Sequence, residues 1–207
     1  QSSGHTNRCP SPLMQRIVLA SGSPYRKRLL QRLGLDFACI APDIDETPAS
    51  GEQPAALVLR LSEAKARAVA LRAPDALVIA SDQVGAADGR LLGKPGTEER
   101  ARQQLRGISG REVRFLTGLC VLDAPSQRTL TGVETCTVHL RELSDGAIRD
   151  YVRREQPLDC AGSFKVEGLG IALFRSLELD DPTALEGLPL IRLVEFLGHF
   201  GVAVLRQ

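Results

Sequence analysis

Residues 16–34 read RIVLASGSPYRKRLLQRLG, and this stretch indicates the fold class. Its first residues, RIVL, are the apolar and β-branched residues of a short strand. Ser23 can cap the helix that follows and Pro24 can take its first position, while Gly34 is a typical helix end. The leucines between them share one helix face. A strand that leads directly into a helix predicts an α/β protein.

The rest of the chain contains further strand and helix patterns. Residues 54–72 have the apolar spacing of a long amphipathic helix, and residues 76–82 form an apolar strand that ends in the carboxylate of Asp82. Two alternating runs, at 111–123 and 129–143, are separated by the turn residues APSQR and predict an antiparallel hairpin. Together these units predict a mixed, twisted sheet with flanking helices, arranged as two lobes around a central cleft.

Length and composition predict one folded domain. The chain has 207 residues, of which 43% are hydrophobic and 25% are charged, and these values are close to those of ordinary globular proteins. Residues 1–13 are polar, contain prolines and have no periodicity, so we expect a disordered tail or the remnant of an expression tag. The single domain is then expected to span residues 14–207.

Charge and cysteine content exclude several classes of protein. Twenty-six basic and 25 acidic side chains leave a net charge of +1, and the chain has no Trp, so a nucleic-acid partner is not expected. No apolar stretch reaches the roughly 18 residues of a membrane span. The five cysteines are an odd number and form no C-x-x-C pair, which indicates a reducing, cytoplasmic compartment. A homodimer is the commonest closed assembly for such a protein.

The start of the first predicted helix is a candidate anion site. Ser21 and Ser23 supply hydroxyls, the first helical turn supplies free backbone N–H groups, and Arg26 supplies a guanidinium. This combination suits a triphosphate. Because serine followed by proline begins many ordinary helices, a purely structural cap is the alternative.

Two acidic residues are candidates for holding a metal or a water. Asp82 follows an apolar run, where an unpaired carboxylate is costly, so a metal, a cation or a water to activate would explain it. Pairing with a nearby Lys or Arg is the structural alternative. Glu46 lies beside Asp45 in a proline-flanked loop, where most acidic residues are simply solvated.

Two lysines and a glycine-rich run complete the candidates. Lys65 lies on the predicted long helix, where the default expectation is a side chain that reaches out to solvent. Lys94 precedes Pro95, which restricts the loop and suits a fixed phosphate contact. Residues 161–170 read AGSFKVEGLG and resemble a flexible lid, with an ordinary turn as the alternative.

Six motifs, in this order, resemble the Maf-like family of nucleoside triphosphate pyrophosphatases. They are LASGSPYRKRLLQRLGLDF, DIDETP, ASDQV, LLGKP, YVRREQPLDCAGSFKVEGLG and LEGLPL. The resemblance spans nearly all of residues 14–200 and implies a Maf/ITPase-like fold. It also implies hydrolysis between the α- and β-phosphates, with a divalent cation, Mg²⁺ or Mn²⁺, as cofactor.

The resemblance implies a role for each candidate residue. Asp82 is expected to act as general base and metal contact, and Glu46 as a contact to the metal or the water. The implied triphosphate contacts are Ser21, Ser23, Arg26, Lys65 and Lys94. Phosphoryl chemistry depends mainly on positioning and charge neutralisation, which acidic and basic residues in one cleft supply.

Three further positions indicate the subgroup. Tyr25, Gln83 and Glu167 stand where the dTTP/UTP subgroup typically has Arg, Thr and Gln, and they resemble the YceF-like subgroup that hydrolyses 7-methyl-GTP. That subgroup is expected to have Trp where this chain has Tyr25. An aromatic face attracts the cationic ring of 7-methylguanine, and a carboxylate can accept from the N–H edge of guanine. The expected activity is therefore a 7-methyl-GTP pyrophosphatase that removes a modified nucleotide from the pool.

Two other functions remain open on the sequence. One is a dTTP/UTP pyrophosphatase of the same family. The other is a non-enzymatic regulator of septum formation that binds a nucleotide in the same cleft. Glu46 and Asp82 together favour the enzyme, because binding a triphosphate alone does not need carboxylates near the phosphates.

Overall fold

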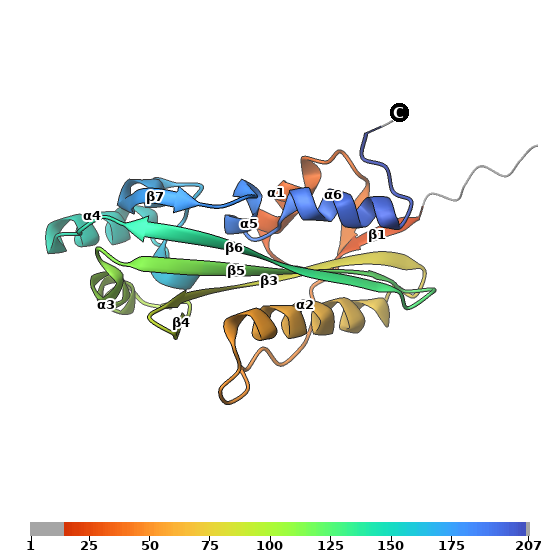
Figure 1. Ribbon diagram of the computed structural model, residues 1–207, viewed down its shortest axis with the longest axis horizontal. Helices are drawn as coiled ribbons and strands as arrows, with labels where there is room; N and C mark the ends of the chain where they lie inside the picture. The colour runs from red at the N-terminus through yellow and green to blue at the C-terminus, as the bar shows by residue number, and fades with distance from the viewer. Residues whose placement is uncertain (1–14, 206–207) are drawn as a thin grey trace, which may run out of the picture.

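The computed structural model describes residues 15–205 and contains one seven-stranded mixed sheet flanked by helices (Figure 1). The strands are β1 (Arg16–Leu19), β2 (Phe37–Cys39), β3 (Ala76–Ala87), β4 (Arg90–Leu92), β5 (Glu112–Asp123), β6 (Thr129–Leu140) and β7 (Phe174–Glu178). The helices are α1 (Pro24–Gln31), α2 (Pro54–Ala70), α3 (Glu98–Ile108), α4 (Asp145–Glu155), α5 (Pro182–Leu185) and α6 (Leu190–His199), with 3₁₀ segments η1 (Ala161–Ser163) and η2 (Leu169–Leu173).

The sheet combines parallel and antiparallel pairs. Its strand order is β2-β1-β3-β5-β6-β7, and β4 pairs with β3. β1 lies parallel to β2 and β3, whereas the other pairs are antiparallel, including the predicted β5–β6 hairpin. This confirms the predicted mixed α/β fold. The expected tail at residues 1–13 lies outside the described residues, so the division into a tail and one domain stays a prediction.

Helices cover the two faces of the sheet differently. At the β1 end, α2 lies on one face, and α1 and α6 lie on the other (Figure 1). At the opposite end, α3, α4 and β7 surround a separate apolar core that includes Phe115 and Phe164. The long strands β3, β5 and β6 run through both ends, which form the two expected lobes. Among residues 15–205, no helix is long and apolar enough to cross a membrane.

The prediction that a strand ends at Asp82 is wrong. β3 continues for five residues to Ala87, because it keeps pairing with the long β5, where Asp82 lies opposite Gly118. On its other side, β3 pairs with β1 only up to Ile79 and with β4 only from Gly85. Between these two partners one side of β3 is open, and Asp82 lies in this gap.

Candidate active site

The cleft between the lobes contains two adjoining pockets. We call them the large pocket, of about 610 Å³, and the small pocket, of about 180 Å³. The polar residues that line the large pocket are Ser21, Ser23, Tyr25, Arg26, Glu46, Lys65, Asp82, Gln83, Lys94 and Asp159. Those that line the small pocket are Ser23, Tyr25, Arg26, Gln83, Lys94, Asp159, Cys160, Glu167 and Glu186. Every residue predicted for the site therefore lines at least one of them.

The start of α1 supplies hydroxyls and a guanidinium. Ser23 caps the helix as predicted, since its Oγ accepts from Arg26 N at 3.4 Å, and Ser21 Oγ accepts from Ser23 N at 3.0 Å. Neither hydroxyl donates to another described residue, so both can still donate to a ligand. The same serines can therefore cap the helix and bind an anion at the same time.

Arg26 is held at the boundary of the two pockets. Its Nε donates to Gly187 O at 2.9 Å, and its terminal nitrogens donate to no described residue. Burial lowers the pKa of Arg26, and the negative charges of Asp82 and Glu46 partly counteract this. Because arginine stays protonated in proteins, the terminal nitrogens are available for a phosphate.

Lys65 joins the two candidate carboxylates. Its Nζ lies 2.6 Å from Asp82 Oδ1 and 2.9 Å from Glu46 Oε1. The side chains of Lys65 and Asp82 are only 6% and 9% exposed, whereas that of Glu46 is 58% exposed. The expectation that Lys65 reaches solvent is wrong, because the buried charge of Asp82 on β3 faces α2. The structural alternative for Asp82, pairing with a lysine, is present in this structure.

Asp82 and Glu46 can hold a divalent cation only if the phosphates of a substrate supply further oxygen ligands. Asp82 Oδ2 and Glu46 Oε2 accept no hydrogen bond from a described residue, so each carboxylate has a spare oxygen. Within residues 15–205, no group of three or more His, Cys, Asp or Glu side chains is placed to hold a metal. Mg²⁺ commonly binds one or two carboxylates together with substrate phosphates. These two carboxylates suit that arrangement.

A close contact between α2 and β5 sets the distance of Lys65 from the sheet. A Cβ at Gly118 would lie 2.4 Å from Val58 O and 2.7 Å from Ser62 Oγ, so only glycine allows α2 this near the sheet. Gly118 is also the partner of Asp82 across the β3–β5 ladder. The glycine thus brings Lys65, which lies one helical turn after Ser62, within reach of Asp82.

The small pocket combines an apolar floor with polar walls. Phe115 and Phe164 pack edge to face beneath it, with centroids 5.0 Å apart. Tyr25 lines it from α1, and the guanidinium of Arg28 lies 5.2 Å from the centroid of the Tyr25 ring. Glu167 comes from the predicted lid and is exposed. An apolar pocket with a few polar groups at its walls is suited to a nucleobase.

Gln83 connects the small pocket to the turn after α5. Its Nε2 lies 2.9 Å from Ala184 O, 3.1 Å from Leu185 O and 3.0 Å from Thr117 Oγ1. Because a carbonyl oxygen can only accept a hydrogen bond, the side-chain nitrogen of Gln83, and not its oxygen, faces these two carbonyls. Gln83 Oε1 accepts from no described residue and is therefore free to accept from a ligand.

Sequence reasoning missed two acidic residues. Asp159 lines both pockets, and Glu186 lines the small pocket. Glu186 belongs to LEGLPL, one of the motifs that carry the family resemblance, but a single acid in a turn has no pattern that indicates a site. Lys94, which was predicted, is exposed, lines both pockets and forms no ion pair with a described residue.

Comparisons with known proteins identify relatives of this chain. Residues 16–200 match the family described as Maf-like protein. A 7-methyl-GTP pyrophosphatase of Nitrosococcus oceani is 56% identical over 196 residues, covering 95% of this chain and 98% of that protein. A 7-methyl-GTP pyrophosphatase of Pseudomonas aeruginosa is 56% identical over 191 residues, covering 92% and 100%.

A solved structure, the Ham1 protein of Staphylococcus aureus, is 20% identical, with a TM-score of 0.42 over 62% of this chain and 73% of that one. Since the family match covers most of the chain and both pyrophosphatases match it along nearly their whole length, the family is settled. The chain belongs to the Maf-like family.

Proposed function

We propose that this protein hydrolyses 7-methyl-GTP between its α- and β-phosphates, releasing 7-methyl-GMP and pyrophosphate and so removing a modified nucleotide from the pool. The observation that carries the proposal is the division of the cleft into two adjoining pockets. The large pocket contains the acids and cations that phosphate chemistry needs, and the small pocket combines aromatic and polar side chains, as a base site does. The two 56% identical relatives with that name support the same substrate.

The triphosphate would occupy the large pocket. Ser21 and Ser23 offer hydroxyl donors, and Arg26 and Lys94 offer positive charge to the phosphate oxygens. Lys65 contacts both Asp82 and Glu46, so a phosphate that replaces one of these contacts keeps the lysine paired. When a phosphate replaces the contact between Lys65 and Asp82, Asp82 Oδ1 becomes free to accept the proton of the attacking water.

Asp82 and Glu46 are also the residues that would hold a divalent cation. A bound Mg²⁺ or Mn²⁺ would neutralise phosphate charge and lower the pKa of a water, which a carboxylate of ordinary basicity needs in order to act as a base near neutral pH. The two spare carboxylate oxygens support this assignment.

The base would occupy the small pocket. The ring of Tyr25 can lie against the cationic ring of 7-methylguanine. Glu167 can accept from the N–H edge of guanine, and Gln83 Oε1 offers a further acceptor. A pyrimidine lacks these donors and would gain less.

A nucleotide panel tests the proposal. Purified protein is incubated with 7-methyl-GTP, GTP, dTTP and UTP in the presence of Mn²⁺ or Mg²⁺, and pyrophosphate release is measured. The largest kcat/KM is expected for 7-methyl-GTP, with no release after the metal is removed with EDTA. A preference for dTTP or UTP would place the chain in the other subgroup. No release from any nucleotide would leave only a binding regulator.

The compartment and assembly remain part of the proposal. Cys39, Cys120, Cys136 and Cys160 are free thiols, which suits the reducing cytoplasm. A homodimer stays a prediction, and sedimentation velocity would test it.

A further inference from the structure

Besides Glu167, which sequence reasoning assigned, and Asp159, which it shares with the large pocket, the small pocket is lined by a further carboxylate, Glu186. We propose that Glu186 acts with Glu167 as a specificity residue that favours a positively charged base, so that the site discriminates 7-methyl-GTP from GTP. This inference rests on the proposed function and names the residue that would read the charge of the base.

The charges around the small pocket are unevenly distributed. Arg26, Lys94 and Asp159 line both pockets, so the two cations are shared with the phosphate side. Among the described residues, the charged side chains that line the small pocket alone are Glu167 and Glu186. The charged residues unique to the small pocket are therefore both acidic, while Arg28, Arg32 and Lys165 lie nearby outside its lining. Two carboxylates in the lining favour a cationic ligand.

Side chains of β3, the strand that contains Asp82, hold the backbone around Glu186. Ser81 Oγ lies 2.9 Å from Gly187 O and 2.7 Å from Gly118 O, so these two acceptors share its one proton. Gln83 Nε2 lies 2.9 Å from Ala184 O and 3.1 Å from Leu185 O. Ser81 and Gln83 flank Asp82 on β3. Glu186 is thus held by the same strand that positions the proposed catalytic carboxylate, and only its side chain needs to adjust to a base.

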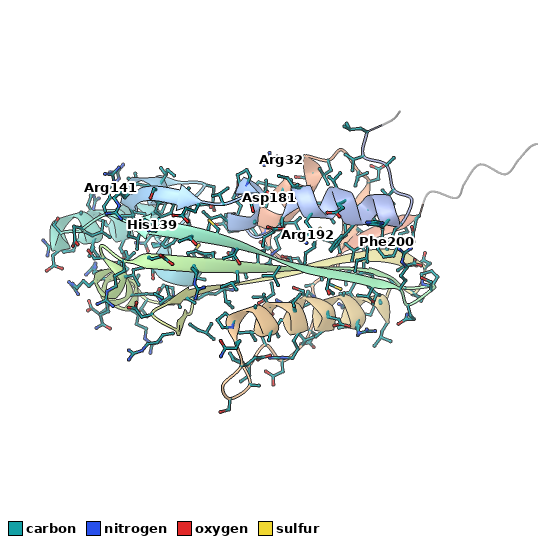
Figure 2. All side chains as sticks on the ribbon, viewed as in Figure 1. Arg32, His139, Arg141, Asp181, Arg192 and Phe200 are labelled. Carbon is teal, nitrogen blue, oxygen red and sulfur yellow. The ribbon has the colours of Figure 1, made fainter. Side chains whose placement is uncertain are left out.

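Further contacts anchor the neighbouring residues of the same turn. Thr117 Oγ1 donates to Ala184 O at 2.9 Å, and Arg26 Nε donates to Gly187 O at 2.9 Å. Asp181, labelled beside α5 in Figure 2, accepts from Thr183 N and from Ile191 N, both at 2.8 Å. These bonds join α5 to α6, so the position of Glu186 does not depend on the lid that carries Glu167.

The small pocket brings two carboxylates near each other, which is electrostatically unfavourable. Burial, followed by the negative charge of Glu167, raises the pKa of Glu186, and the positive charges of Arg32 and Arg28 counteract part of the effect. A cationic ring relieves the repulsion between the two acids, whereas neutral guanine does not. One carboxylate is enough to accept from the N–H edge of guanine, so the second contributes mainly through its charge.

The test compares Glu186→Gln with wild type, because this change removes the charge and keeps the shape. The kcat/KM values for 7-methyl-GTP and GTP are measured, and the Kd values of 7-methyl-GMP and GMP are measured by calorimetry without metal. We expect the preference for the methylated base to fall about tenfold in both ratios, with the values for GTP and GMP changed less than threefold. Glu186→Asp, which keeps the charge, is expected to retain part of the preference.

Glu195→Gln, on the exposed face of α6, is the matched control and is expected to leave both ratios unchanged. If wild type releases no pyrophosphate from 7-methyl-GTP, the proposed function fails, while the monophosphate Kd ratio still tests Glu186. If wild type prefers the methylated base and Glu186→Gln keeps that preference within threefold, the inference alone fails. An equal loss for methylated and unmethylated ligands would also overturn it, since that result indicates a role in positioning only.

Discussion

The two pockets differ in how their charged side chains are held before a ligand binds. In the large pocket, Lys65 contacts both Asp82 and Glu46, so the buried charges are already balanced. In the small pocket, Glu167 forms no hydrogen bond or ion pair with a described residue, and burial, followed by the negative charge of Glu167, raises the pKa of Glu186. A buried, paired charge is costly to alter, whereas a partly exposed acid tolerates change. The phosphate chemistry is therefore expected to be fixed, and the base preference to be adjustable.

The largest effect is expected for Asp82→Asn in the large pocket. The amide keeps the shape but loses the charge that pairs with Lys65 and accepts a proton, so kcat is expected to fall by about 10³-fold or more while nucleotide still binds. Kinetics and calorimetry on the same variant measure the two quantities. Asp45→Asn is the matched control, because Asp45 is an exposed loop acid whose contact to Thr47 N an asparagine oxygen can retain. A wild-type kcat in Asp82→Asn would remove this residue from the mechanism.

Arg26→Ala is expected to weaken every triphosphate alike. Its guanidinium would contact a group that all substrates share. The transition-state stabilisation calculated from kcat/KM should therefore fall by about 2–4 kcal/mol for each nucleotide, with the ratio of kcat/KM between 7-methyl-GTP and UTP unchanged. Lys27→Ala, one residue further along α1 and exposed, is the control. An effect confined to one nucleotide would assign Arg26 to the base pocket instead.

Changing three residues of the small pocket should move the preference without abolishing turnover. Tyr25→Arg, Gln83→Thr and Glu167→Gln together are expected to lower the ratio of kcat/KM for 7-methyl-GTP over UTP at least tenfold, about 1.4 kcal/mol. Glu167→Gln is the most informative single step, because an amide donates where the carboxylate only accepts. A ratio within about threefold of wild type, roughly 0.7 kcal/mol, would show that these side chains do not read the base.

Gly118→Ala tests whether the packing of α2 sets the Lys65–Asp82 contact. The new Cβ would meet Val58 O, so α2 must move away from the sheet, and we expect a loss of about 1–3 kcal/mol in the free energy of unfolding together with lower kcat. Gly107→Ala in α3 is the control, because nothing lies within 4 Å of a Cβ there. Urea titration measures stability. An unchanged stability and kcat in Gly118→Ala would mean that the close approach is not needed.

The sequence predicted local structure better than long-range pairing. The Ser23 cap, the end of the first helix near Gly34 and the β5–β6 hairpin all follow from neighbouring residues, and the structure contains them. The end of β3 was predicted at Asp82 because the apolar run ends in that carboxylate. Only the pairing with β5, whose Gly118 lies opposite Asp82, shows why the strand continues.

The site could be predicted in part for the same reason. Ser21, Ser23 and Arg26 lie close together in the sequence at the start of one helix, so their combination predicts a phosphate site. Lys65 and Asp82 are 17 positions apart on different elements, and a lysine on an amphipathic helix has no pattern that distinguishes a buried pair from an exposed side chain. The residues of the small pocket could be predicted only from the family resemblance. Glu186 could not be predicted, because its place in the pocket depends on how the turn after α5 packs against β3.

The smallest effect is expected for Tyr25→Trp, which concerns the one position where the chain departs from the expected subgroup residue. Arg28 covers one face of the Tyr25 ring at 5.2 Å, so only the opposite face is available to a base. Trp has the stronger attraction for a cation, by about 0.5 kcal/mol at a partly exposed site, so the Kd of 7-methyl-GMP should fall about twofold while that of GMP stays the same. Tyr25→Leu, which removes the aromatic face and keeps an apolar side chain, should raise the Kd of 7-methyl-GMP more than that of GMP. Equal changes for the two ligands in calorimetry would mean that Tyr25 contributes contact area rather than recognition of the charge.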